Sequence, residues 1–499
     1  MSAWWRNAVV YEIYVRSFAD ASGDGVGDLA GVRNRLPYLA SLGVDAIWLT
    51  PFFPSPGADH GYDVADYLDV DPLFGDLGEL DRLLDAAHAL GIRVVIDLVP
   101  NHTSVEHPWF RLHPDYYVWA DEPNNWLSVF GGPAWTFDPA RGRYYLHLFA
   151  PEQPDLDWHN PAVRDEFERI MRFWLDRGVD GIRVDVAHGL FKDRALHDED
   201  EPVPGAELHS FDRRRAIDRP ELHPLYREWR SLVDGYPGDR FLVGEVFFRD
   251  PERVAAYCRP DELHLVFNFT LLFTEWDAGA MRDAIERTLD SLGRVGATPS
   301  WVLETHDVTR LPTRYGGGEE GLRRARAAAL LLLALPGAVF LYQGQELGLE
   351  EAELADEERQ DPIFFRTGGA RPGRDGCRVP LPWTEEPPAL GFSSARPWLR
   401  QPAAFAERSA AAQAADADST LNLYRRAIAL RPRGAFAWRD SPPGTLAFTR
   451  GDTLCLVNVA ADPVRLRERD LVLASEPLHG AVDAGAAAWL RSPRPKSAP

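Results

Sequence analysis

The stretch DLGELDRLLDAAHALGIRVVID, residues 76–97, contains the unit from which most of this chain is built. Asp76 and Glu79 stand three residues apart, as in a capping box, and predict the beginning of a helix. Leucine and alanine residues then recur at three- and four-residue spacing on one face. Gly91 leads into the apolar run at residues 93–97. The stretch therefore predicts a helix followed directly by a buried strand.

Strand and helix patterns of this kind recur along the chain. Residues 9–14 are a short apolar run, residues 29–39 have a helical pattern, and residues 46–49 form a second apolar run. This run ends before Pro51, which lacks a backbone donor. Further predicted strands lie at residues 181–185, 241–246, 263–267, 300–303 and 339–342. Eight strands alternating with helices predict an α/β fold, a (β/α)8 TIM barrel over residues 1–102 and 161–430.

Three segments depart from this alternation. Residues 103–160 are too long for one helix and rich in Trp, Tyr, Asn, Gly and Pro, so we expect an inserted subdomain at the barrel mouth. Residues 348–400 are dense in Gly, Pro and charge, which predicts an irregular loop near that mouth. Short apolar runs between turns predict a C-terminal β-sandwich over residues 431–499, with a disordered tail from residue 492.

Composition excludes several classes of function. A net charge of −22 disfavours nucleic acid, and no apolar run approaches the roughly 18 to 20 residues of a membrane span. Cys258, Cys377 and Cys455 lie far apart, which argues against a disulfide framework or a structural zinc site. No secretory signal stands at the beginning. We therefore expect a cytoplasmic protein, a monomer or homodimer, whose partners are small molecules.

Carboxylates stand at the ends of four predicted strands. Asp97 closes the third strand, Asp185 the fourth, Glu245 the fifth and Asp307 the seventh. The C-terminal ends of barrel strands point into one shared mouth. Any one of these residues alone is more often a helix cap or an ion-pair partner. Four together predict a functional site.

The residues expected near these acids suit chemistry on a sugar. His102, Arg183 and His306 lie next to the same strand ends. Glycoside hydrolysis develops positive charge on the sugar ring and needs an acid for the leaving oxygen, so converging carboxylates suit it. A metal site is the alternative, but no His or Cys spacing typical of zinc is present.

Four blocks of sequence resemble the α-amylase superfamily of glycoside hydrolases. They are DLVPNH at residues 97–102, GIRVD at 181–185, GEV at 244–246 and HD at 306–307, in the family's order and strand contexts. QPDLDW at residues 153–158 and the opening at residues 5–18 most resemble the oligo-1,6-glucosidase and α-glucosidase branch. The resemblance implies a retaining double displacement, with Asp185 as nucleophile, Glu245 as general acid/base and Asp307 as a third catalytic carboxylate.

The resemblance also implies which residues bind the sugar. They are His102, Arg183 and His306 as polar partners, Tyr62 as a stacking platform, Phe130 and Phe149 as apolar walls, and Gln153 nearby. Exo-acting relatives close the pocket with an Asp before Gly-Tyr-Asp and an Arg after the eighth strand. Asp59 matches the first, and Arg374 or Arg378 the second, with Arg374 favoured. This implies an exo-acting α-glucosidase that hydrolyses terminal non-reducing α-linked glucose from short oligosaccharides.

A loop after the first strand has the composition of a cation site. Asp20, Ser22, Asp24, Val26 through its carbonyl, and Asp28 alternate along a Gly-rich stretch, as oxygen ligands of Ca²⁺ or Mg²⁺ do. The family's loop matches, except that Ser22 replaces a commoner Asn. We expect a structural cation and no organic cofactor, and an acidic turn without metal is the alternative.

Two other functions fit the same residues. A transglycosylase or a trehalose- or sucrose-type isomerase would use this site with a sugar in place of water. A binding protein or transporter subunit is less favoured, because Asp185 and Glu245 are retained. Thr305 stands where the family usually has Asn, which alters the donor pattern beside His306. Val186 stands where relatives tune linkage preference, and it does not decide between α-1,4 and α-1,6 bonds.

Overall fold

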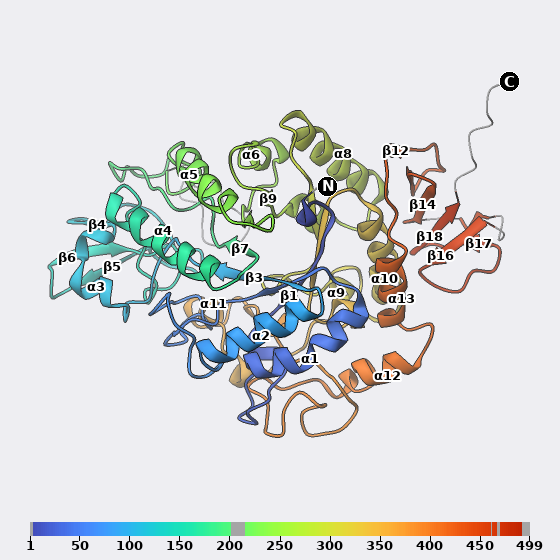
Figure 1. Cartoon of the computed structure of the whole chain (residues 1–499), viewed down its shortest axis with the longest axis horizontal. Helices are drawn as coiled ribbons and strands as arrows, with labels where there is room; N and C mark the ends of the chain where they lie inside the picture. Colours follow the sequence, from blue (N-terminus) through green and yellow to red (C-terminus); the bar gives the residue numbers. More distant parts are fainter. Residues whose placement is uncertain (1–2, 201–214, 461, 467–469, 492–499) are drawn as a thin grey trace.

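Eight parallel strands form a barrel at the centre of the molecule (Figure 1). The computed structural model describes residues 3–200, 215–460, 462–466 and 470–491. The strands are β1 (Val9–Ile13), β2 (Ala46–Leu49), β3 (Arg93–Leu98), β7 (Gly181–Val184), β8 (Phe241–Gly244), β9 (Leu265–Val266), β10 (Ser300–Val302) and β11 (Ala338–Tyr342). They pair in the order β10-β11-β1-β2-β3-β7-β8-β9. Between β9 and β10, the Ser300 hydroxyl donates to the Val266 carbonyl at 2.5 Å. The predicted (β/α)8 barrel is confirmed.

Helices surround the barrel. The longer ones are α1 (Leu29–Leu42), α2 (Leu77–Ala89), α4 (Pro161–Asp176), α5 (Leu222–Asp234), α8 (Ala278–Arg294), α10 (Gly318–Ala334) and α13 (Thr420–Ala429). Of these, α1, α2, α4, α8 and α13 begin at a side-chain cap. Asp76 caps α2 by accepting from the Glu79 N–H at 2.6 Å. The Glu79 side chain does not complete the capping box; it pairs with Arg33 of α1 at 2.6 Å and with Arg82 at 2.7 Å. The acid thus ties two neighbouring helices together.

Shorter elements occupy the connections. They are α3 (Pro108–Leu112), α6 (Pro251–Ala256), α7 (Phe269–Leu272), α9 (Leu311–Arg314), α11 (Pro362–Arg366) and α12 (Ala410–Ala415), with 3-10 turns η1 (Trp4–Asn7), η2 (Val15–Ser17), η3 (Pro114–Tyr116), η4 (Gln345–Leu347), η5 (Asp356–Glu358), η6 (Asp375–Cys377) and η7 (Ala403–Phe405). Only such short pieces lie in residues 348–400, so this segment is irregular, as predicted.

The segment between β3 and α4 forms a small antiparallel sheet on one side of the barrel. Its strands are β4 (Trp119–Ala120), β5 (Trp135–Asp138) and β6 (Arg143–Leu146), in the order β4-β6-β5. Lys192, in the loop after β7, ties the segment to the barrel. Its ammonium lies 2.7 Å from the Asp155 carboxylate and donates to Asn101 Oδ1 at 2.6 Å and to the Gly189 carbonyl at 2.5 Å.

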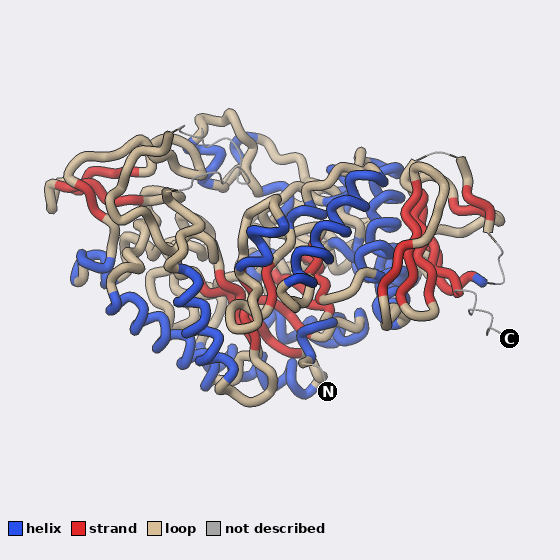
Figure 2. Tube along the Cα trace, turned by 90° about the horizontal axis from the view of Figure 1, so that it is seen from above, coloured by secondary structure: helices blue, strands red, loops and turns tan. Residues whose placement is uncertain are grey.

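A C-terminal all-β domain lies on the other side, so that the barrel separates the two small sheets (Figure 2). Five antiparallel strands follow the order β12 (Phe436–Trp438), β13 (Thr445–Arg450), β14 (Thr453–Asn458), β18 (Ala486–Arg491) and β16 (Leu471–Ala474), and β15 (Val464–Arg465) pairs with β17 (Ala481–Val482). Trp489 of β18 donates its indole N–H to the Leu330 carbonyl of α10 at 3.1 Å. The tail predicted to be disordered, residues 492–499, lies outside the described residues.

Two features of composition have structural counterparts. Cys258, Cys377 and Cys455 are buried free thiols. Among the helices that the structure describes, none combines the length and the apolar character needed to cross a bilayer.

Candidate active site

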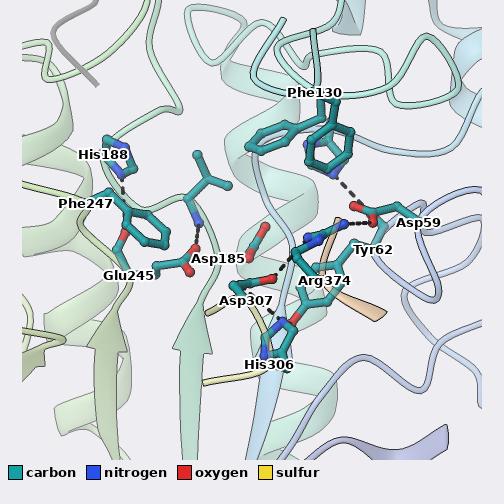
Figure 3. A pocket seen from close by; sticks show the side chains of 13 residues that line it. Asp59, Tyr62, Phe130, Asp185, His188, Glu245, Phe247, His306, Asp307 and Arg374 are labelled. Carbon is teal, nitrogen blue, oxygen red and sulfur yellow. Dashed lines mark hydrogen bonds and ion pairs between the residues drawn. The ribbon is translucent and has the colours of Figure 1, made fainter. Parts of the chain in front are cut away.

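A pocket at the C-terminal ends of the barrel strands brings the predicted residues together (Figure 3). Its lining consists of Asp59, Tyr62, His102, Phe130, Phe149, Asp185, Val186, His188, Glu245, Phe247, His306, Asp307 and Arg374. Of the catalytic and substrate-binding residues that we predicted, only Gln153 and Arg183 are missing from this lining. Both lie directly behind it, in contact with residues that form its wall.

One guanidinium holds two carboxylates at the pocket wall. Asp185 follows β7 and Glu245 follows β8, two strands paired in parallel. Arg183 Nη1 lies 2.5 Å from Asp185 Oδ1, and Arg183 Nη2 lies 2.6 Å from Glu245 Oε1. Asp97, behind them, pairs with the same arginine at 2.8 Å. A fully buried cation therefore sets the relative position of both carboxylates.

Backbone geometry next to Asp185 also positions Glu245. Val186 has a φ of 44°, a left-handed conformation that is costly for a β-branched residue. This conformation directs its N–H to Glu245 Oε2, at 3.0 Å. Glu245 Oε2 thus accepts from Val186, and Glu245 Oε1 forms the ion pair with Arg183.

Burial controls the protonation of the two carboxylates. It raises the pKa of Asp185 to about 7 and that of Glu245 to about 8, while Arg183 lowers both. For Asp185, burial outweighs the attraction of the adjacent Arg183. Neighbouring carboxylates raise the pKa of each group further: Asp97 and Asp307 act on Asp185, and Asp185 and Asp307 act on Glu245.

Asp307 is held in the ionised state. Burial alone would raise its pKa, but His306, Arg374 and Arg378 together keep it below its ordinary value. Arg374 Nη1 lies 3.0 Å and Arg378 Nη2 2.9 Å from Asp307 Oδ1. Asp185 and Asp307 therefore differ strongly in charge environment although both line one pocket.

His306 is fixed by two partners, of which one was not predicted. Its Nδ1 lies 2.5 Å from the carboxylate of Glu12, near the C-terminal end of β1, and its Nε2 lies 2.8 Å from the Tyr62 hydroxyl. The Tyr62 ring stacks on the imidazole at a centroid distance of 5.4 Å. The signal for Glu12 was a single acid within an otherwise apolar strand, VVYEI.

The opposite end of the pocket is closed by an ion pair. Arg374 Nη2 donates to Asp59 Oδ1 at 2.7 Å, and Arg374 Nε donates to Asp361 at 2.6 Å. Gln153 donates to the other oxygen of Asp59 at 3.2 Å. Arg378 does not reach Asp59; besides Asp307, it binds the His306 carbonyl at 2.8 Å. Of the two candidate arginines, Arg374 is the one at this end. Asp361, for which no sequence pattern provided a signal, anchors it.

Comparison with known proteins identifies the family. Residues 12–438 match the model of the α-amylase catalytic domain. The chain belongs to the α-amylase family. It is 40% identical to a probable α-glucosidase from Rhizobium meliloti, over 92% of this chain and 89% of that protein, and 37% identical to an oligo-1,6-glucosidase from Heyndrickxia coagulans, over 86% and 85%. The crystal structure of an α-glucosyl transfer enzyme, XgtA, is 40% identical and superposes with a TM-score of 0.89 over 98% of this chain and all of that one. The protein is therefore a glycoside hydrolase of the oligo-1,6-glucosidase and α-glucosidase branch.

Aromatic and histidine side chains complete the pocket of this α-amylase-family enzyme. His102 lies 3.0 Å from the Tyr62 carbonyl, and burial lowers its pKa to about 4, so the ring is neutral. Its imidazole packs against Phe149, at a centroid distance of 5.2 Å. His188 and Phe247 were not predicted as site residues. They follow Asp185 by three and Glu245 by two positions, so their place directly after a strand end was the available signal.

The predicted cation loop is a tightly hydrogen-bonded turn. Asp20 accepts from the N–H groups of Gly23 and Gly25, at 2.6 and 2.8 Å. Asp28 caps α1 and also accepts from the Ser22 N–H at 2.9 Å, while Asp24 accepts from the Val26 N–H at 2.8 Å. Within the described residues, no group of three or more His, Cys, Asp or Glu side chains is arranged to hold a metal ion. A cation in this loop would have to share its oxygens with these N–H donors.

Proposed function

We propose that this enzyme is an exo-acting, retaining α-glucosidase that removes terminal α-linked glucose from short saccharides. The observation that carries the proposal is the arrangement of the pocket. Asp185 and Glu245 share one guanidinium at its wall, and the Asp59–Arg374 ion pair closes it on another side. A closed pocket with a carboxylate pair accommodates one terminal sugar and cleaves the bond behind it.

In the proposed mechanism, the Asp185 carboxylate attacks the anomeric carbon while Glu245 protonates the leaving oxygen. The C1–O bond of the substrate breaks, and a glucosyl ester of Asp185 forms. Glu245 then removes a proton from water, which attacks the same carbon and releases Asp185. Retaining enzymes separate the two groups by about 5 to 5.5 Å. Attachment of both to the nitrogens of Arg183 suits such a short separation.

The other pocket residues hold and distort the sugar. Asp307 is ionised, and its Oδ2 lies 3.3 Å from His306 Nε2. Its carboxylate can accept hydrogen bonds from sugar hydroxyl groups, and these bonds would strengthen as the sugar ring flattens. Tyr62 offers a ring face, and Phe130 and Phe149 are apolar walls. Charged donors and acceptors on Arg374 and Asp59 suit the hydroxyls farthest from the scissile bond. Their ion pair would exclude longer chains from passing through.

Transfer of glucose to another sugar is the second candidate function. The observation that favours it is the likeness to a protein named as an α-glucosyl transfer enzyme, at 40% identity over 98% of this chain. The same ester of Asp185 would be attacked by a sugar hydroxyl instead of water. Product analysis after incubation with maltose, isomaltose, sucrose and trehalose separates the two functions. We expect free glucose as the main product, whereas conversion to another disaccharide would favour an isomerase.

Release of p-nitrophenol from its α-glucoside tests the catalytic roles. We expect Asp185→Asn to lower kcat by about 10⁴-fold or more, because removal of a nucleophile abolishes the covalent route. Wild-type inactivity on every glucoside would favour a binding protein. Equal activity of the wild type and Asp185→Asn would remove Asp185 from the mechanism.

A structural Ca²⁺ or Mg²⁺ on the loop at residues 20–28 also stands as a proposal. Its support is chemical: carboxylate oxygens that accept one N–H keep further lone pairs, and hard cations prefer oxygen ligands. No step of the mechanism depends on it.

A further inference from the structure

A buried acid lies behind one wall of the catalytic pocket. Glu12 belongs to β1, and its Oε1 atom lies 2.5 Å from Nδ1 of His306, a residue of the pocket lining. Both side chains are only 1% exposed. The opposite ring nitrogen of His306, Nε2, faces Tyr62 and Asp307, as Figure 3 shows. The distribution of protons in the pair therefore decides what the imidazole offers to the pocket.

The surroundings of Nε2 require a proton on this nitrogen. The Tyr62 hydroxyl has one O–H, which donates to Asp97 Oδ2 at 3.1 Å. Asp97 Oδ2 is an acceptor, since Arg183 Nη1 also donates to it, at 3.0 Å. The Tyr62 oxygen, 2.8 Å from Nε2, must therefore accept a hydrogen bond from His306. The ionised Asp307, whose Oδ2 lies 3.3 Å from Nε2, is a second acceptor.

A proton on Nε2 leaves Nδ1 in need of a donor. Burial lowers the pKa of His306 well below its ordinary value, although Asp307 opposes this, so the ring is uncharged and Nδ1 has a free lone pair. Burial also raises the pKa of Glu12 well above its ordinary value, against the attraction of Arg183, so this acid keeps its proton. Glu12 Oε1 can then donate to Nδ1 and accept from the His306 backbone N–H at 3.3 Å. Within the described residues, Glu12 is the sole hydrogen-bond partner of Nδ1.

Aromatic side chains also confine the imidazole ring. The Tyr14 ring lies nearly parallel to it, with 5.6 Å between the centroids and 22° between the planes, and the Trp48 ring packs edge-on at 6.1 Å. Tyr14 is covered in turn by the Arg378 guanidinium, 5.2 Å from its ring centroid. A turn of the imidazole that exchanged its two nitrogens would require these packed rings to move. The partners at the two nitrogens therefore fix the pattern of protons.

We propose that Glu12 is a positioning residue of the reaction: its carboxyl O–H binds His306 Nδ1 and thereby holds an N–H on Nε2 that faces the pocket. In the proposed function, this N–H acts through Tyr62 and Asp307, which hold the terminal sugar. The catalytic role thus rests on the proposed function, whereas the placement of the proton does not. Without Glu12, the ring has no satisfied arrangement. A proton on Nε2 leaves a buried lone pair on Nδ1, and a proton on Nδ1 leaves Tyr62 and Asp307 without their donor.

Neutron diffraction of the wild-type enzyme after deuterium exchange tests the placement of the protons directly. We expect one deuterium on His306 Nε2 and a second between Glu12 Oε1 and His306 Nδ1. An Nε2 without deuterium would overturn the proposal. This result does not depend on any substrate, so it is also obtained if the proposed function fails. Failure of the proposed function would be seen separately, because the wild type would then release no p-nitrophenol from its α-glucoside.

Two variants of Glu12 test the catalytic role. Glu12→Gln offers an amide N–H to Nδ1, so we expect kcat/KM for p-nitrophenyl α-glucoside to stay within about threefold of the wild type. Glu12→Leu has no donor, and the resulting shift of the ring is expected to lower kcat/KM about 10- to 100-fold. Wild-type activity of Glu12→Leu, or an equal loss in both variants, would contradict the role of Glu12.

Glu346→Leu is the matched control for a merely structural role. Glu346 is a buried acid that accepts from the hydroxyls of Tyr11 and Tyr38, at 2.8 and 2.7 Å, and it is not part of the pocket lining. Its replacement is expected to lower the Tm, while kcat/KM of the folded enzyme stays within about twofold of the wild type. A loss of kcat/KM as large as in Glu12→Leu would show that removal of any buried acid has this effect, and would overturn the proposal. If Glu12→Leu does not fold, the neutron measurement still decides it.

Discussion

Replacement of Asp59 by Asn tests how the closed end of the pocket contributes to catalysis. The change keeps the shape of the side chain and removes its charge. Asp59 accepts from Arg374 at 2.7 Å and from Gln153 at 3.2 Å, and it is buried. A hydrogen bond that involves a charged group contributes about 1.5 to 3 kcal/mol. Loss of one such bond between enzyme and sugar should therefore lower kcat/KM about 10- to 150-fold.

Glucose release from maltose measures this effect, with circular dichroism to check the fold. Asp66→Asn is the matched control, because Asp66 lies seven residues further along the same loop and is exposed. We expect the control to stay within about twofold of the wild type, since exposed substitutions away from a site have small effects. A value of kcat/KM for Asp59→Asn that is also within twofold would refute the role of Asp59 in binding the terminal sugar.

Three further predictions follow from charges elsewhere in the structure. Hydrolysis needs Asp185 ionised and Glu245 protonated. A plot of kcat/KM against pH between 5 and 10 should therefore be bell-shaped, with limbs near pH 7 and 8. A profile that is flat from pH 6 to 9 would contradict this assignment. Lys192→Met should cost about 3 to 5 kcal/mol of unfolding free energy, measured with urea, because it leaves the buried Asp155 without its cation; a cost below 1 kcal/mol would show that this ion pair is dispensable. If a cation binds near Asp20, dialysis against EDTA should lower the Tm and Ca²⁺ should restore it, whereas an unchanged Tm would rule out a stabilising cation.

The catalytic end of the barrel was predictable because strand direction fixes it. Each apolar run that ends in an acid places that acid at the mouth, so Asp185, Glu245 and Asp307 could be selected without knowledge of their contacts. Pairing partners inside the barrel could not be found in this way. Glu12 binds His306, which lies 294 positions away, and no local pattern connects them. The same holds for Asp361, whose importance lies in holding Arg374.

The C-terminal domain shows where local propensity misleads. The strand β18 has the sequence AAAWLR, and alanine has little preference for strands. Tertiary context decides its structure, because β18 lies between β14 and β16 and contacts α10 through Trp489. The more typical β13 (TLAFTR) and β14 (TLCLVN) contain β-branched or aromatic residues and are short apolar runs of the kind predicted for this part of the chain. The residues of β13 and β14 favour a strand by themselves, whereas β18 is a strand because of the strands with which it pairs.

The shared guanidinium has a consequence for the order of proton transfers. Arg183 lowers the pKa of both Asp185 and Glu245, so its field alone cannot make one an acid and the other a nucleophile. The difference must come from the other neighbours, and the negative charge of Asp185 is among the factors that raise the pKa of Glu245. When the proposed ester forms, that charge disappears while Arg183 remains. The pKa of Glu245 must then fall, which converts the residue from an acid that holds its proton into a base able to accept one from water. The same two contacts of Arg183 thus serve both halves of the reaction.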